Sequence, residues 1–378
     1  MKIGIMSMQR IVNNGSFLQS YSLMKNIERM GHEVVFVDYE PGSVLVEKEF
    51  ENNSIFDSVN SIIKKIKKRL IFKRGDMDPD WKLYTDWSKD YCENMMPLLG
   101  LSDSKQYKSL VDMLVIGSDE VFNCLQPNPE VGFSEQLFGG DNNAKRVISY
   151  AASFGNTSIN GLRKYNIENR VLQLLDKMDD ISVRDKNSVS IVQKLTQKTP
   201  QYHVDPVFLY DYEKEMPEEV SEQGYIVVYA YSLRIQEKEA KAILRFAKKH
   251  NKKIICLAGV QEYFGGFINT NPFESLAYVK NADYVITDTF HGTVFSIKYN
   301  KKFASIVRDG EGTKYGNSNK MIDLLSRFSL ENRIVNDINK LESILLEEQD
   351  FTNVNNIISK ERAISLEYLE RNIAQIHN

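Results

Sequence analysis

The sequence predicts an α/β protein with two domains, each a sheet of buried strands that alternate with helices. Short apolar runs rich in β-branched residues recur along the chain, and segments with helical spacing of apolar residues separate them. The same alternation starts again after an acidic segment at residues 211–222. A chain of 378 residues is also longer than most single domains. Buried strands joined by helices are typical of parallel sheets, so we expect two such sheets in series.

The composition is that of a globular protein with sizeable cores, because 42% of the residues are hydrophobic. A formal net charge of −3 argues against a general nucleic-acid binder, which is usually basic. The three cysteines are scattered and odd in number, which suits a reducing cytoplasm, and their spacing suggests neither zinc nor an iron–sulfur cluster. We expect no metal and no cofactor. The chain begins directly with a strand and has no apolar run of ~20 residues, so we expect neither a signal peptide nor a membrane span.

The first unit is predicted to be a strand at residues 2–6, a turn at 13–16, a helix at 17–30 and a strand at 33–39. This Rossmann-like start lacks the G-x-G-x-x-G pattern, so it does not predict a dinucleotide site. The turn instead offers its backbone N–H groups, including that of Gly15, and the side chains of Asn13 and Asn14 at the mouth of the sheet. A tight turn that simply needs Asn and Gly conformations is the alternative interpretation.

A basic stretch begins at Ile62 and ends at Arg74, with seven basic residues from Lys64 onward and no acidic one. Ile62, Ile63, Ile66 and Leu70 fall on one face of a helix. A basic amphipathic helix of this kind can lie on an anionic membrane surface, which would make the protein peripheral at the inner face of the cell membrane. A solvated surface helix is the alternative.

The core pattern resumes with three strands that end in polar or small residues, at 113–116, 146–155 and 179–185. Ser118 and Asp119 lie in the polar turn after the first strand, and Ser153 lies at the end of the second. A helix is predicted at residues 162–178. The end of the third strand carries Arg184, whose charged, planar fork of donors suits a phosphate or a carboxylate. A surface salt bridge with Asp185 is the alternative.

The rest of the chain is predicted to repeat the alternation. A strand near residues 203–209 leads into the acidic linker at 211–222. Beyond the linker we expect strands at 225–231, 253–259 and 302–307, and helices at 236–250, 271–280, 318–328 and 356–377.

The stretch at residues 282–297 contains the strongest candidate site. A buried strand is predicted to end at Asp288 and a helix to begin within a few residues, with a polar corner at residues 287–289. The candidate ligand-binding residues of this corner and of the turn after it are Thr289, Phe290, His291, Gly292 and Thr293. Ligands of open α/β sheets bind at this edge, where free N–H groups and the helix dipole favour an anion. A histidine that only caps the turn is the alternative.

Seven motifs occur in order along the chain: N-N-G-S-F-L-Q (13–19), V-I-G-S-D-E-V-F-N (115–123), S-Y-A-A-S-F-G (149–155), I-S-V-R-D (181–185), V-D-P (204–206), T-D-T-F-H-G-T-V-F-S-I (287–297) and S-N-K-M-I-D-L-L (318–325). Together they resemble the polysaccharide pyruvyl transferase family. The resemblance implies two Rossmann-like domains in a GT-B-like arrangement with a cleft between them. We expect these domains at residues 1–215 and 222–350, with a helix at 351–378 crossing back to the first domain.

The resemblance also implies that pyruvate moves from phosphoenolpyruvate to two hydroxyls of a sugar in a cell-surface glycan, forming a ketal. Arg184 matches the family arginine that binds the donor, and His291 matches the histidine proposed as acid or base. The first domain, which also carries Arg184, is the expected acceptor side. Family members carry an arginine where this chain has Thr289. Three cations are candidates to replace that charge: Arg308, Lys314 and Lys320.

Two other functions stay open at this point. One is a glycosyltransferase of the same architecture, with Arg184, His291 and the helix N-terminus binding a nucleotide-sugar diphosphate. The other is a non-catalytic member that binds a glycan or a phosphorylated ligand. The acceptor glycan is free, nucleotide-linked or lipid-linked, and the sequence does not distinguish these forms.

Overall fold

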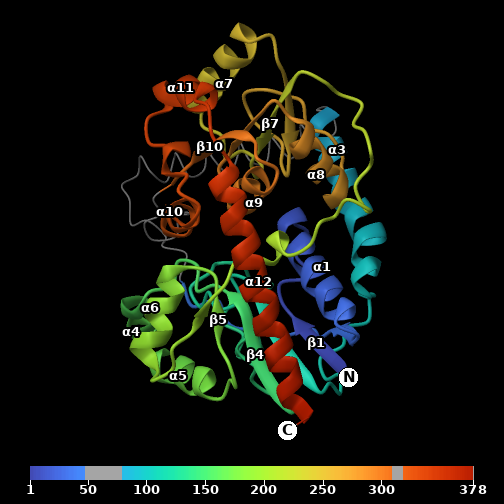
Figure 1. Cartoon of the computed structure of the whole chain (residues 1–378), viewed down its shortest axis with the longest axis vertical. Helices are drawn as coiled ribbons and strands as arrows, with labels where there is room; N and C mark the ends of the chain where they lie inside the picture. The colour runs from blue at the N-terminus through green and yellow to red at the C-terminus, as the bar shows by residue number, and fades with distance from the viewer. Residues whose placement is uncertain (47–78, 309–317, 378) are drawn as a thin grey trace, which may run out of the picture.

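Two separate parallel sheets, each covered by helices, form the protein (Figure 1). The computed structural model describes residues 1–46, 79–308 and 318–377. Ile3 lies in the first sheet and Ile286 in the second, so the prediction of two α/β domains is confirmed. The architecture is a pair of Rossmann-like domains in a GT-B-like arrangement.

The first sheet has six strands in the order β2-β1-β3-β4-β5-β6, all parallel. Alternate residues of its central strand β3 point into two different cores. Met113 and Val115 belong to one core, and Leu114 and Ile116 belong to the other. Both faces of the sheet are therefore covered, which explains why its strands are apolar throughout. The strands are β1 (Lys2–Met6), β2 (Glu33–Phe36), β3 (Met113–Asp119), β4 (Arg146–Ala152), β5 (Ser182–Val183) and β6 (Gln201–Tyr202).

The helices that accompany this sheet are α1 (Asn14–Arg29), α4 (Ile159–Lys164), α5 (Glu168–Asp176) and α6 (Lys186–Leu195). Helix α3 (Pro79–Asp90) follows β2 in the chain but packs against the second domain, where the ring of Tyr84 lies 5.5 Å from that of Phe267 (Figure 1). A short π-helical segment, Tyr91–Met95, continues α3. Helix α1 packs against the second domain as well as against its own sheet. The ring of Phe17 lies edge-on to that of Phe273, with centroids 5.6 Å apart.

The second sheet has five parallel strands in the order β11-β10-β9-β7-β8. The strands are β7 (Tyr225–Tyr229), β8 (Lys253–Leu257), β9 (Tyr284–Thr287), β10 (Lys302–Ile306) and β11 (Ile334–Val335). The helices are α7 (Glu237–Lys249), α8 (Pro272–Asn281), α9 (Phe290–Lys298), α10 (Ser318–Arg327), α11 (Leu341–Leu346) and α12 (Thr352–Ala374).

The long last helix, α12, runs from the second domain along the first (Figure 1). The hydroxyl of Tyr368 donates to the carbonyl oxygen of Ser149 in β4 at 2.9 Å. Arg146, at the start of the same strand, donates to the side chain of Asn372 at 2.6 Å. These contacts attach the C-terminal end of α12 to the sheet of the first domain.

Several predicted element boundaries are wrong. No strand occupies residues 203–209, because Asp205 accepts from the Val207 N–H and Pro206 begins a 3-10 turn instead. Helix α1 begins three residues before the predicted start, since the side chain of Asn13 accepts from two N–H groups and caps it there. The helix predicted at 162–178 is two helices, α4 and α5, with Asn166 between them at a φ of 56°.

The basic stretch at residues 62–74 lies outside the described residues, and so does Lys314. In the described ranges, none of the helices is both long enough and apolar enough to span a membrane.

Candidate functional site

His291 lies in the first turn of α9, directly after the carboxyl end of β9. Thr289 caps the helix, because its hydroxyl accepts from the Gly292 N–H at 2.9 Å. The cap fixes the start of α9, so the imidazole of His291 lies at the N-terminal end of the helix, where the helix dipole is positive. Only 7% of the His291 side chain is exposed. The predicted corner is therefore present, with Thr289 as its capping residue.

Gly15, in the first turn of α1, lies directly against the imidazole of His291. A Cβ atom on residue 15 would lie 2.1 Å from Nδ1 of His291, far inside van der Waals contact. The absence of a side chain is what lets the two helix N-termini meet. The contact joins residues 276 positions apart and brings the carboxyl edges of the two sheets together.

Arg184 is buried between two carboxylates of the first domain. It donates from Nη1 to Oδ2 of Asp205 at 2.8 Å and from Nη2 to Oδ1 of Asp119 at 3.2 Å. Its guanidinium carbon lies 4.3 Å from the centre of the Phe290 ring, a cation–π contact that reaches across to α9. Only 2% of the Arg184 side chain is exposed.

Asp205 connects the arginine to the histidine. Its Oδ2 atom accepts from Arg184 and also lies 3.5 Å from Nε2 of His291. The carboxylate is fully buried and holds the imidazole from one side, while Gly15 supports it from the other. Arg184 and His291 therefore do not face each other across open space. They share one carboxylate.

The charges of this cluster shift one another's pKa values. Burial alone would raise the pKa of Asp119, but Arg184 and His291 outweigh it and lower that pKa to about 2. Burial would also raise the pKa of Asp205, but His291 and Arg184 together outweigh this effect and lower it. Burial likewise works against the charge of Arg184, yet Asp119 and Asp205 raise its pKa above the ordinary value. All three groups are therefore held in their charged forms at neutral pH.

The N-terminus of α1 is hydrogen-bonded to both domains. Ser16 donates to Asp119 at 2.6 Å, within the first domain. Asn13 donates to the hydroxyl of Tyr231 at 2.7 Å, and Asn14 donates to the hydroxyl of Ser275 at 2.8 Å, both in the second domain. Asn14 and Gly15, predicted from the sequence as site residues, thus belong to the seam between the domains.

Lys320 reaches the same region from α10. Its ammonium group pairs with the carboxylate of Glu120, which follows Asp119 at the end of β3. Burial raises the pKa of Glu120, and the nearby Lys320 more than offsets this and lowers it. Lys320 is thus close to the cluster, with its charge directed at Glu120.

The other predicted site residues are buried and hydrogen-bonded inside the protein. Ser118 donates to the carbonyl oxygen of Ala151, and Ser153 donates to the carboxylate of Asp185. The hydroxyl of Thr293 donates to the backbone of Thr289. All of them lie at the carboxyl edges of the sheets, where they shape the backbone around the cluster.

Two features were not predicted from the sequence alone. Asp205 lies in the V-D-P motif, but nothing in that tripeptide shows that its carboxylate meets a histidine 86 positions away. The second is an ion cluster in the second domain, where Asp288 pairs with Arg234 at 2.9 Å and with Arg308 at 3.1 Å. Arg308 also pairs with Glu239, so its charge is compensated.

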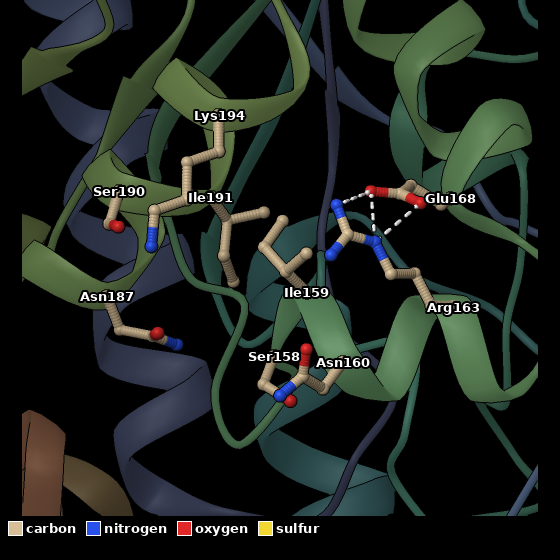
Figure 2. A pocket seen from close by; sticks show the side chains of 9 residues that line it. All are labelled: Ser158, Ile159, Asn160, Arg163, Glu168, Asn187, Ser190, Ile191 and Lys194. Atoms are coloured by element: carbon tan, nitrogen blue, oxygen red, sulfur yellow. Dashed lines mark hydrogen bonds and ion pairs between the residues drawn. The ribbon is translucent and has the colours of Figure 1, made fainter.

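Two polar pockets lie outside this cluster. One, of about 510 Å³, lies between α4 and α6, and Figure 2 shows Asn160, Ser190 and Lys194 around it. Arg163 at its rim pairs with Glu168 at 3.0 Å. The other, of about 440 Å³, lies between the two domains beside α3 and α8. In the described ranges, no group of three or more His, Cys, Asp or Glu side chains is arranged to hold a metal ion.

Two facing parallel sheets with a buried histidine–carboxylate–arginine cluster at their meeting edges define a two-domain α/β protein whose candidate site lies at the domain boundary. The model of the polysaccharide pyruvyl transferase family matches residues 13–310, most of the chain. The chain belongs to this family of transferases. Comparison with curated proteins found no significant match.

Solved structures with a similar course of the chain were also found. UDP-GlcNAc 2-epimerase from Methanocaldococcus jannaschii, in complex with UDP-GlcNAc and UDP, is 11% identical with a TM-score of 0.47, covering 95% of this chain and 99% of that one. The spinosyn rhamnosyltransferase SpnG is 10% identical with a TM-score of 0.47, covering 99% and 100%. UDP-GlcNAc 2-epimerase from Neisseria meningitidis is 9% identical with a TM-score of 0.45, covering 98% and 100%.

Proposed function

We propose that the protein transfers pyruvate from phosphoenolpyruvate to a sugar of a cell-surface polysaccharide or its precursor, forming a pyruvate ketal. The observation that carries the proposal is the position of His291. It is a proton-carrying group at the N-terminus of α9, held between Gly15 and Asp205 at the domain boundary. Membership of the pyruvyl transferase family supports the choice of donor.

The reaction needs a group that both gives and takes protons. The donor's methylene carbon takes up a proton, and one sugar hydroxyl loses its proton as its oxygen bonds to the adjacent carbon. The carbon–oxygen bond to phosphate then breaks, the second hydroxyl adds to the same carbon, and its proton leaves with the phosphate. The products are one ketal and one inorganic phosphate. An imidazole can both give and accept a proton, and the carboxylate of Asp205, 3.5 Å from Nε2 of His291, holds the ring in place.

The arginine proposed to bind the anionic donor, Arg184, is already paired with two carboxylates. Asp119 and Asp205 already neutralise Arg184, so a phosphate or carboxylate must share or replace one of these partners. The meeting of the α1 and α9 N-termini adds positive potential at the same place. We therefore assign Arg184 as the donor-binding charge and the two helix N-termini as its support.

Release of inorganic phosphate from phosphoenolpyruvate tests the proposal, measured with and without a panel of glycan acceptors. We expect acceptor-dependent release, and we expect His291→Gln to reduce turnover by roughly 10²–10⁴-fold. His250→Gln is the matched control, because His250 lies in the second domain at the end of α7 and pairs with Glu342. Turnover of a nucleotide sugar without any phosphate release from phosphoenolpyruvate would overturn the proposal.

A further inference from the structure

The pocket of about 440 Å³ at the domain boundary lies between two segments that are distant in sequence. One wall comes from the end of α3 and the π-helical segment after it, and the other comes from the chain that leads into α8. The indole N–H of Trp87 donates to the carbonyl oxygen of Thr270 at 2.9 Å, and Asn269 donates to Asp90 at 2.8 Å. The pocket is thus fixed by direct hydrogen bonds between its walls.

The lining of this pocket is polar, and among the described residues that line it the charged ones are acidic. Asp90 and Glu274 carry the two carboxylates, and Asn94 and Asn269 contribute amides. Each carboxylate uses one oxygen for a bond across or along the wall, Asp90 to Asn269 and Glu274 to the backbone of Asn271. The second oxygen of each accepts no hydrogen bond from the described residues.

The acidic lining of this pocket disfavours binding of the anionic donor, phosphoenolpyruvate. Two carboxylates without a lysine or arginine among the lining residues repel a phosphate or a carboxylate ligand. Carboxylate oxygens and amides instead suit a ligand with neighbouring hydroxyl groups. A hydroxyl can donate to a carboxylate, and it can both donate to and accept from an amide. The rings of Trp87 and Tyr91 also line the pocket and are themselves almost fully buried, so they form its rigid apolar base. A neutral sugar fits this lining best.

The pocket wall is connected to the candidate catalytic cluster. Tyr91, which lines the pocket, donates from its hydroxyl to the carbonyl oxygen of Asn13 at 3.0 Å. Asn13 caps α1, and the first turn of that helix supplies Gly15, which lies against His291. On the opposite wall, the hydroxyl of Thr270 is 2.8 Å from that of Ser275, which accepts from Asn14.

We propose that this pocket binds a neutral hexopyranose of the glycan acceptor, with Asp90, Asn94 and Glu274 as the groups that recognise its hydroxyls. The inference rests on the proposed function for its biological meaning, because it supplies the acceptor site of that reaction. The binding itself does not depend on turnover.

Ligand-observed NMR with neutral methyl glycosides of glucose, galactose and mannose tests the pocket directly. We expect at least one of them to bind the wild-type protein. Asn94→Trp fills the pocket from an exposed position and should abolish that binding. Asn160→Trp is the matched control, since Asn160 is also an exposed asparagine and lines the other polar pocket (Figure 2).

The outcomes separate this inference from the proposed function. Loss of glycoside binding in Asn94→Trp alone, with an unchanged melting temperature, supports the pocket even if phosphoenolpyruvate is not the donor. In an active enzyme the same variant should raise the acceptor KM at least tenfold and leave the donor KM unchanged. Wild-type-like binding by Asn94→Trp, loss of binding in Asn160→Trp, or no binding of any glycoside by the wild type would overturn it.

Discussion

The position of His291 depends on a residue without a side chain. A methyl group on Gly15 would collide with the imidazole, which is buried and held by Asp205 on its other side. We expect Gly15→Ala to displace the ring, reduce turnover at least tenfold and cost about 1–3 kcal/mol of unfolding free energy through overpacking. Steady-state kinetics beside urea unfolding measures both effects.

Gly265→Ala is the control for this substitution. A Cβ atom there would come no closer than 3.3 Å to another group, the carboxylate of Asp80, and the residue lies in a loop of the second domain. This variant should keep its activity. A Gly15→Ala protein with wild-type turnover would show that the packing of His291 against α1 has no part in the reaction.

A second histidine, His203, makes stability depend on pH. Burial, aided by the charge of Arg327, lowers its pKa from 6.5 to about 4. As the pH falls, the unfolded chain takes up the proton first, so stability is complete above pH 6.5 and is lost between pH 6.5 and about 4. From about 1.36 kcal/mol per pKa unit, the folded state should lose about 2 kcal/mol between pH 7 and pH 5 through this group.

Urea unfolding at the two pH values measures this loss, and His203→Asn provides the comparison. The asparagine can keep the hydrogen bond that Nδ1 of His203 makes with Ser182 at 2.7 Å, but it does not titrate. The variant should lose about 2 kcal/mol less than the wild type over the same interval. An equal loss in both proteins would assign the pH dependence to other groups.

At the scale of elements, the sequence predicts most of what is local. Apolar runs such as β1 and β7 have one dominant interpretation, and the strand predicted to end at Asp288 places the start of α9 within a few residues. Polar or strained breaks were harder. Asn166, which ends α4, and Pro206, which ends the first sheet, interrupt patterns that otherwise continue.

The candidate site shows the same division. His291 and Arg184 were identifiable because each follows a predicted strand, where the sheet edge makes a ligand site expected. The partners of these residues were not, because Asp119 and Asp205 meet Arg184 only through the tertiary fold. No spacing rule connects residues that different strands bring to one edge.

Helix α10 provides a test of how the domains are joined. Asp323 accepts from the N–H of Lys186 at 2.9 Å and from the hydroxyl of Tyr202 at 2.8 Å, so a residue of the second domain caps α6 in the first. We expect Asp323→Ala to cost about 1–2 kcal/mol of unfolding free energy, as the loss of an N-cap does. Asp337→Ala, which removes a cap within one exposed turn, should cost less.

At the scale of the whole molecule, α12 ties the second domain to the first sheet. Tyr368 is buried there, with its ring centroid 4.6 Å from that of His203 and its hydroxyl bonded to Ser149. Tyr368→Ala removes the ring and the hydrogen bond together, which should cost about 3–5 kcal/mol at this junction. Ile364→Ala is the control, because Ile364 is 41% exposed on the same helix.

Tyr368→Ala removes contacts between α12 and the first sheet and leaves the interior of each sheet unchanged. The two domains of the variant should therefore unfold at different urea concentrations. Wild-type circular dichroism and tryptophan fluorescence should change together in urea, because the two tryptophans lie in α3, which Trp87 bonds to the second domain. In Tyr368→Ala the two signals should diverge, since the first sheet then loses its support from α12 before the α3 contacts open. Coincident transitions in the variant would show that the remaining contacts between the domains, such as the α1–α9 seam and the cap that Asp323 provides to α6, hold them as one cooperative unit.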